Sequence, residues 1–226
     1  MQDALLNAAM TVLARDGWRG ATLRAVAEAA PCPLAEIVSR YGDFYGLLDA
    51  ISEQATLTAL KEADAAGGSQ AIRDRLFEVL MARLDALQEH RPGIKALLPE
   101  QARDPLLAAW FAVKAPRQMA RIAAAAGVRT HGLRGLLRVQ GLTFLYLRVA
   151  RIWLDDETED LAKTLKALDQ ALAQAERWAH RLDRMAPPAK PGKRLPDGSG
   201  DFRLSGLGER GASISPSSTA QNPATA

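Results

Sequence analysis

The chain has 226 residues, 48% of them hydrophobic, and its 29 basic and 26 acidic side chains leave a formal net charge of +3. This length and apolar content suffice for one or two packed domains. The small net charge does not by itself indicate a nucleic-acid partner. We find no signal sequence and no run of about 18 apolar residues, so we expect a cytoplasmic protein without a transmembrane segment.

Apolar residues recur at helical spacing along most of the chain and no strand pattern appears, so the sequence predicts an all-α fold. Proline and glycine mark the boundaries, as where Gly17 and Gly42 close the first and third helices. A last helix should follow Asp155, with Asp156 and Glu159 as a capping pair. The earlier helices are expected at residues 3–15, 21–30, 34–41, 44–65, 69–89, 94–98, 104–125 with a bend near Pro116, and 133–154.

The last helix carries leucine and alanine at alternating spacings of four and three residues, which is a heptad seam that requires a partner helix. Packing within one subunit would satisfy the seam. The preceding helix, however, is apolar on more than one face, so we expect a homodimer in which both helices contribute to a four-helix interface. The expected interface residues are Leu147, Leu161, Leu165, Leu168, Leu172 and Ala175.

Composition changes after Met185, because Pro, Gly and Ser make up 18 of the 41 residues 186–226. Such a segment has too few large apolar side chains to form a core, and we expect a disordered tail. The predicted organisation is a helix-turn-helix unit at residues 1–48, a helical ligand-binding and dimerisation domain at 49–185, and this tail.

Residues 5–48 resemble the helix-turn-helix unit of the TetR family of transcriptional regulators. The resemblance rests on Ala8-Ala9, Gly17-Trp18, Thr22-Leu23, Val26-Ala27, Ile37, Tyr41 and Leu47-Leu48. It implies a TetR-like fold, operator DNA as partner, and a third helix that enters the major groove while the second crosses the phosphates. The implied DNA-binding residues are Thr22, Arg24, Leu34, Ser39, Arg40 and Tyr41.

Several positions of this unit depart from the family pattern. Pro31 replaces the usual glycine of the turn, Val38 the usual tyrosine of the third helix, and Phe44 the usual phosphate-contacting lysine, while Glu36 stands where a hydroxyl residue is common. Residues 1–50 hold four arginines against six carboxylates. Because phosphate neutralisation supplies most non-specific affinity, these features predict weak DNA binding.

Two later segments, 72–94 and 151–172, are similar to TetR-fold lipid-binding accessory proteins of ubiquinone biosynthesis. This resemblance implies an alternative function, the binding of an isoprenoid-like lipid without DNA recognition. The Pro/Gly/Ser tail differs from the terminal amphipathic helix of those proteins. We therefore predict a transcriptional regulator controlled by a small apolar effector, with the lipid-binding accessory protein as the alternative.

Enzyme motifs are absent: His90, His131 and His180 lack metal-ligand spacing, and no nucleophile elbow or phosphate loop occurs. We expect no enzymatic activity, no cofactor and no metal. Large apolar side chains of the second domain could surround an effector, although packing within the core is the simpler interpretation. The candidate pocket residues are Met81, Trp110, Met119, Phe144 and Tyr146, whereas Arg83 is placed outside the apolar face of its helix.

Overall fold

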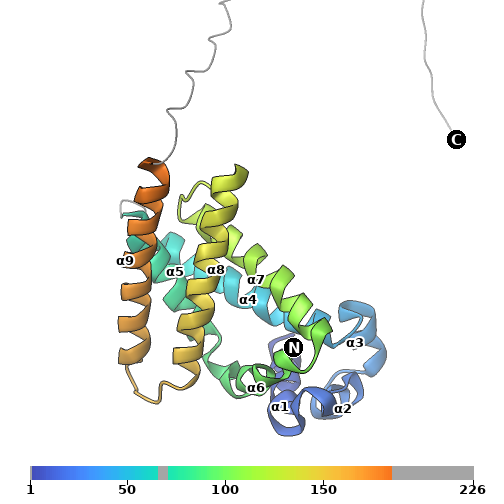
Figure 1. Cartoon of the computed structure of the whole chain (residues 1–226). Coiled ribbons are helices and arrows are strands. Elements are labelled where there is room, and N and C mark those ends of the chain that lie inside the picture. The colour runs from blue at the N-terminus through green and yellow to red at the C-terminus, as the bar shows by residue number, and fades with distance from the viewer. Residues whose placement is uncertain (1, 66–70, 185–226) are drawn as a thin grey trace, which may run out of the picture. The chain divides into compact units, whose positions relative to one another are not determined.

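The computed structural model describes residues 2–65 and 71–184, and every regular element within these ranges is a helix (Figure 1). The predicted all-α fold is therefore confirmed for this part of the chain; the predicted tail, 186–226, lies outside it. The α-helices are α1 (Gln2–Gly20), α2 (Leu23–Ala29), α3 (Leu34–Tyr41), α4 (Phe44–Ala65), α5 (Ile72–Ala86), α6 (Arg91–Leu97), α7 (Pro105–Ala125), α8 (Gly132–Leu154) and α9 (Ala162–Arg184). Two short 3-10 turns, η1 (Gln88–His90) and η2 (Pro99–Ala102), flank α6.

The first three helices pack against one another, and Leu13, Val26 and Ile37 contribute fully buried side chains to the core that they share with the other helices. Gly17 interrupts the helical conformation of α1 with φ 69° and ψ 176°. Gly42 ends α3 with φ 75°. Both angles lie where residues with a side chain are strained, which explains glycine at the two positions.

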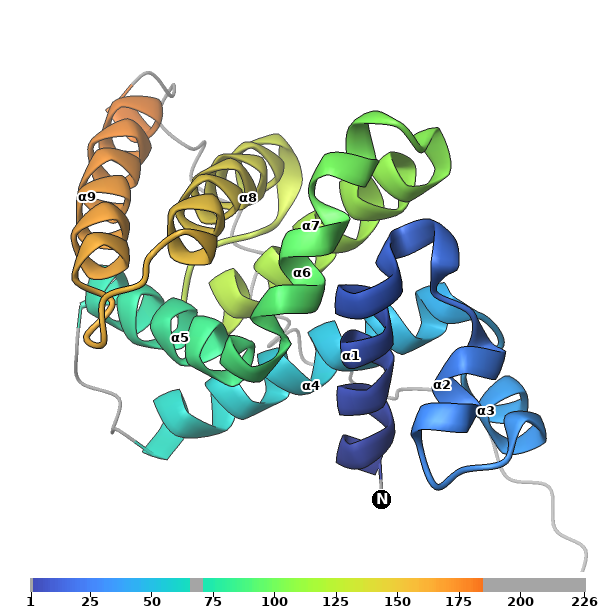
Figure 2. The same ribbon diagram turned by 90° about the horizontal axis from the view of Figure 1, so that it is seen from below.

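Helix α4 runs through the boundary predicted at residue 48/49. Asp43 starts it, since the Asp43 carboxylate accepts a hydrogen bond of 2.9 Å from the Gly46 amide. From there α4 packs against α1 and α3 at one end and against α5 and α7 further along (Figure 2). The division into two domains at this point remains a prediction, because one helix serves both parts.

Helix α1 lies directly against α6. A Cβ atom on Gly93 of α6 would come within 2.7 Å of the Met10 Cε atom and 2.8 Å of the Met10 carbonyl oxygen. Only glycine allows this approach of the two backbones. The helix-turn-helix unit is thereby held to the rest of the chain by direct helix packing.

Helix α9 packs against α8 and α5 of the same subunit. Leu168 and Leu172 of the predicted seam are 1% and 2% exposed and belong to the subunit's core, so their assignment to a dimer interface is wrong. The bulk of their side chains is already covered by intramolecular partners. Leu161, with φ 51°, precedes the helix, and Leu161, Leu165 and Ala175 are half-buried.

The outward surface of α8 is apolar instead. Five of its large side chains are between 42% and 74% exposed: Leu133, Leu136, Leu137, Phe144 and Leu147. We call these five residues the α8 stripe. In the described part of the chain nothing covers them.

A buried carboxylate organises the loop between α8 and α9. Asp156 is fully buried and accepts hydrogen bonds from the Thr158 hydroxyl at 2.6 Å, the Thr164 hydroxyl at 2.7 Å and the Thr164 amide at 2.9 Å. The predicted capping pair with Glu159 is wrong, because the helix begins only at Ala162 and Asp156 reaches it through Thr164. These bonds, from Thr158 first and Thr164 next, hold the pKa of Asp156 far below its usual range.

We expect Asp156→Asn to lower the Tm at pH 7, since an amide cannot accept hydrogen bonds from both threonines. The native pKa is depressed, so the contribution of the carboxylate is complete above the unfolded pKa of about 3.9 and is lost as the pH falls below it. The Tm difference between wild type and variant should therefore shrink between about pH 5 and pH 2. Asp155→Asn, which only removes an exposed ion pair with Lys95, is the matched control. A Tm difference that does not change with pH would contradict this role.

Candidate DNA-binding surface and ligand cavity

The third helix presents a short, mostly polar surface. Ser39 and Arg40 are exposed on α3, Leu34 is half-buried at its start, and Tyr41 is half-buried at its end. The Arg40 guanidinium lies 5.6 Å from the centre of the Tyr41 ring and donates a 2.9 Å hydrogen bond to the Gln2 side chain. Arg40 is thus oriented by neighbours while its charge is not neutralised.

Helix α2 starts at a capped terminus. The Thr22 hydroxyl accepts a hydrogen bond of 3.2 Å from the Ala25 amide, which is the N-cap geometry. Arg24 follows in the first turn and is exposed. Thr22 therefore positions the helix end, and Arg24 is the charged group that this end presents to solvent.

The remaining arginines of the unit have carboxylate partners. Arg15 is paired with Asp16 at 2.7 Å and Arg19 with Glu100 at 3.6 Å. In residues 2–65 and 71–184 no ion pair involves Arg24 or Arg40. Few cations of the helix-turn-helix unit are therefore available to contact phosphates, which agrees with the acidic composition of residues 1–50.

Phe44 occupies the position where the TetR pattern has its phosphate-contacting lysine. It is 8% exposed, and its ring lies edge-on to Trp18 with 5.9 Å between the ring centres. The side chain is part of the core that joins α1 to α4. A side chain buried in this way contributes to packing and is not exposed for contact with a phosphate.

Aromatic rings continue from this point into the second half of the chain. Trp18 contacts Tyr45, Tyr45 contacts Trp110, and Trp110 contacts Phe111, with ring centres 4.9 to 5.9 Å apart. The Trp18 indole also donates a 2.8 Å hydrogen bond to Asp104, whose carboxylate caps α7. This bond lowers the pKa of Asp104. The helix-turn-helix unit and α7 are thus joined by a continuous set of contacts.

Trp110 and Phe111 also line a cavity of about 180 Å³ between α1, α4, α5, α6, α7 and α8. Met119 and Tyr146, which the sequence also suggested for a pocket, lie in the same wall. Most of the lining is apolar and comes from both halves of the chain. The other apolar lining residues are Met10, Leu48, Ile51, Leu87, Ile94, Leu97, Leu98, Ala115, Leu147, Ala150, Trp153 and Leu154. The cavity is large enough for a small organic molecule, since an apolar cavity of about 150 Å³ holds benzene.

Two predicted pocket residues lie elsewhere. Phe144 is 69% exposed on the outer face of α8, so its assignment to a pocket is wrong. Met81 lines a second, more open cavity of about 500 Å³ beside the start of α9. Five carboxylates surround that second cavity, namely Glu62, Glu78, Asp85, Glu159 and Asp160.

The most informative residue of the first cavity is one that the sequence pattern placed outside the apolar face of its helix. Arg83 is 5% exposed and lines the cavity. A signal was present in the sequence: Arg83 stands three residues after Leu80 and four before Leu87, which places it on the apolar face of α5. A charged residue on the buried face of a helix is rare unless it is paired with another group or has a functional role.

The partners of Arg83 are all uncharged. Its Nε donates to the Tyr146 hydroxyl at 3.2 Å, its Nη1 to the Ser52 carbonyl at 2.9 Å and to the Thr56 hydroxyl, and its Nη2 to the Ser52 hydroxyl at 2.9 Å. Tyr146 also lies beneath the guanidinium, 5.7 Å from its carbon to the ring centre. The hydrogen bonds fix the orientation of the guanidinium without neutralising it.

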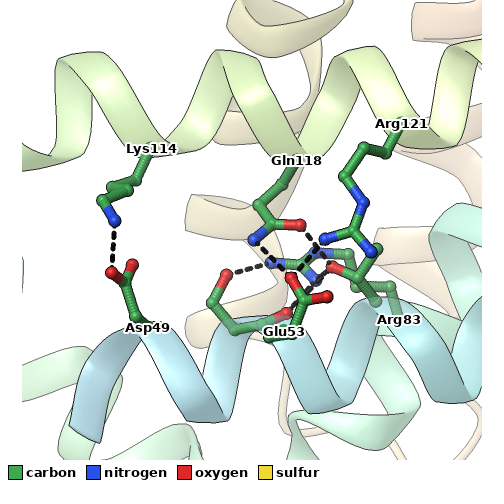
Figure 3. A network of polar contacts seen from close by, with 8 residues as sticks. Asp49, Glu53, Arg83, Lys114, Gln118 and Arg121 are labelled. Atoms are coloured by element: carbon green, nitrogen blue, oxygen red, sulfur yellow. Dashed lines mark hydrogen bonds and ion pairs between the residues drawn. The ribbon is translucent and has the colours of Figure 1, made fainter. Parts of the chain in front are cut away.

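The carboxylates of α4 near Arg83 are engaged by α7 (Figure 3). Asp49 is paired with Lys114, and Glu53 with Arg121 and Gln118, the latter at 3.3 Å. The pKa of Glu53 is lowered first by the hydrogen bond from Arg121, and the charge of Arg83 is the smallest of its causes. Neither Asp49 nor Glu53 lines the cavity.

In the described residues no group of three His, Cys, Asp or Glu side chains is arranged to hold a metal ion. No helix of residues 2–65 and 71–184 combines the length and the apolar content needed to cross a bilayer. The notable features of this part of the chain are therefore the exposed α3 surface, the α8 stripe and the cavity that contains Arg83.

Among known proteins, only solved structures are similar to this chain. No protein-family model matches the sequence, and neither does any curated protein. Among solved structures, a TetR transcriptional regulator from Nitrosomonas europaea ATCC 19718 is similar with a TM-score of 0.64 and 24% identity, over 78% of this chain and 98% of that one. A putative TetR-family transcriptional regulator from Rhodococcus sp. is similar with a TM-score of 0.51 and 21% identity, over 77% of this chain and 97% of the other. The chain therefore has the fold of the TetR-family transcriptional regulators.

Proposed function

We propose that this protein is a DNA-binding transcriptional regulator, in which α3 enters the major groove and α2 crosses the phosphates. The observation that carries the proposal is the complete three-helix unit with Ser39 and Arg40 exposed on α3 and Arg24 at the start of α2. These are the positions from which a helix-turn-helix reaches base edges and phosphates. The TetR fold of the described chain supports the same function.

The regulator acts as a homodimer in this proposal. Two half-sites one helical turn apart require two helix-turn-helix units, and dimer symmetry supplies them. The α8 stripe is the surface best suited to the contact, because it is apolar, exposed and on the helix that the sequence analysis assigned to dimerisation. The buried residues Leu168 and Leu172 of α9 are excluded from it.

A small effector would bind in the 180 Å³ cavity. Met10 of α1 and Leu48 of α4 both line it, so the cavity wall includes the helices that support α2 and α3. A ligand that fits only one arrangement of these helices would shift the equilibrium between arrangements and thereby the DNA affinity.

The alternative, an isoprenoid-binding accessory protein, is favoured by the scarcity of unpaired cations in the helix-turn-helix unit. The observed cavity volume of about 180 Å³ is close to that of a cavity that holds benzene, which favours a small effector over a whole isoprenoid chain. Both functions can be tested on one preparation, by capture of genomic DNA fragments at low salt and by organic extraction of the purified protein. A retained fragment with a defined footprint supports the regulator; an extracted isoprenoid with no retained DNA would overturn it.

For a retained fragment, Arg24→Ala should weaken the salt dependence of binding. Each phosphate contact contributes about −0.9 to the slope of log affinity against log salt, so the slope should flatten by about one unit per subunit. Arg40→Ala should instead reduce discrimination between operator variants, by about 1–3 kcal/mol per site if it reaches a guanine. Arg15→Ala, whose charge is already paired with Asp16, is the control that should change neither quantity. Equal effects of all three substitutions would contradict this assignment.

A lysine at position 44 should not restore the missing phosphate contact. Phe44→Lys removes a ring buried against Trp18, and we expect it to lower the free energy of unfolding by about 3 kcal/mol. Val38→Lys adds the same charge on α3 at a side chain that is 46% exposed, so it should leave stability nearly unchanged and strengthen non-specific DNA binding. Chemical denaturation and filter binding measure the two effects. Equal stability of the two variants would show that Phe44 does not join α1 to α4.

Two glutamate substitutions distinguish the α8 stripe from the buried seam. Phe144→Glu should leave helical content intact but convert dimer to monomer in sedimentation velocity, because it places a charge in an apolar contact. Leu168→Glu should unfold the subunit, at a cost of more than about 3 kcal/mol. Leu106→Glu on α7, where the leucine is 66% exposed and lies outside the α8 stripe, should change neither mass nor stability. A Phe144→Glu protein that is still dimeric would exclude the stripe as the interface.

A further inference from the structure

The cavity has a distinct electrostatic character. Three of its lining residues are cationic, Arg83, Lys114 and Arg151, and no lining residue is a carboxylate. Lys114 is neutralised by Asp49. Arg151 is exposed, at the solvent side. Arg83 is therefore the one buried charge among the three that line this cavity.

A buried cation of this kind is energetically expensive. An arginine keeps its charge in proteins, and removing that charge from water costs several kcal/mol unless an opposite charge compensates it. Hydrogen bonds account for four of the five N–H groups of Arg83, each with a neutral oxygen, and one N–H of Nη2 remains. A carboxylate in the cavity would supply a negative charge in direct contact with the guanidinium, which Glu53 does not provide, and would gain a charge-assisted hydrogen bond.

Tyr146 makes the same end of the cavity suitable for an anion. Its hydroxyl oxygen accepts from Arg83, so the hydroxyl hydrogen is free to donate to another acceptor, and no donated bond is observed in the described residues. The same cavity is also lined by the aromatic side chains of Trp110, Phe111 and Trp153. The lining thus combines hydrogen-bond donors of Arg83 and Tyr146, which suit an anion, with aromatic side chains, which suit a hydrocarbon group.

We propose that the cavity binds a small apolar carboxylate, about the size of benzoate, whose carboxylate pairs with Arg83 and whose hydrocarbon part contacts the aromatic side chains. This inference deepens the proposed function, because it names the chemical class of the effector. Neutral molecules of the same shape bind less well, since they leave the charge of Arg83 uncompensated. Organic cations are excluded from the cavity by like-charge repulsion.

Matched acid and amide pairs test the charge preference directly. Isothermal titration calorimetry compares benzoate with benzamide, phenylacetate with phenylacetamide and hexanoate with hexanamide on the full-length protein. At least one carboxylate should bind, one per chain, at least tenfold more tightly than its amide, because a hydrogen bond to a charged group contributes more than a neutral one. If no carboxylate binds more tightly than its amide, the proposal is overturned.

Variants then show which of the three cationic residues causes the preference for the carboxylate. Arg83→Gln should reduce the preference for the acid to less than threefold, whereas Arg151→Gln and Lys114→Gln, which remove the other two lining cations, should preserve it. Loss of the preference in Arg151→Gln or Lys114→Gln would overturn the assignment to Arg83. If Arg83→Gln does not give a cooperative thermal transition, the two control variants still test the assignment. A preference for the carboxylate that persists in both of them leaves Arg83 as its partner among the three lining cations. None of these titrations requires DNA, so this proposal and the DNA-binding proposal can fail separately.

Discussion

Helix α4 contributes buried side chains along its length to contacts with α1 and α3 at one end and with α5 and α7 further along, and the arrangement of the other helices depends on this constraint. At its start Phe44 packs on Trp18 and fixes the helix-turn-helix unit. Two to three turns later Ser52 and Thr56 accept the hydrogen bonds of buried Arg83. Because a helix is stiff over this length, a change at the Arg83 end is expected to move the Phe44 end with it. The same helix thus forms part of the cavity wall and of the support for α3.

Local signals in the sequence were sufficient for the elements nearest the helix-turn-helix. The bounds predicted for the third and fourth helices, 34–41 and 44–65, agree with α3 and α4, because Pro33, Gly42 and Asp43 stop and start helices by local backbone chemistry. Candidate residues of the exposed α3 surface could be placed for the same reason. Their role in binding DNA stays a prediction.

These local signals could not predict which side chains are buried by parts of the chain that are distant in the sequence. The heptad seam of α9 showed that a partner helix was needed, but not that α5 and α8 of the same subunit supply it. Helix α8 is apolar on several faces, so periodicity could not show that Phe144 faces outward. Arg83 was misplaced because its charge was given more weight than its position between Leu80 and Leu87. In each case the deciding contacts join residues far apart in the sequence.

The two cavities differ in a way that bears on function. The more open one is surrounded by carboxylates, whereas the one that reaches α1 and α4 is lined by cations and aromatic rings. Both cavities include residues of α4, but only the second also includes a residue of α1, Met10, so that it touches both helices that pack against α2 and α3. In the proposed function, a ligand there would affect DNA binding through direct packing, with the contacts from Trp18 through Tyr45 to Trp110 as a further physical link.

The coupling between cavity and helix-turn-helix is the central claim of this account. It is tested most directly by measuring the affinity for a retained genomic fragment with and without a saturating concentration of the carboxylate that binds most tightly. A change of at least about fivefold is predicted, together with an equal change in carboxylate affinity when DNA is saturating, because the coupling of two binding sites is reciprocal. Identical DNA affinities in the presence and absence of bound carboxylate would contradict it.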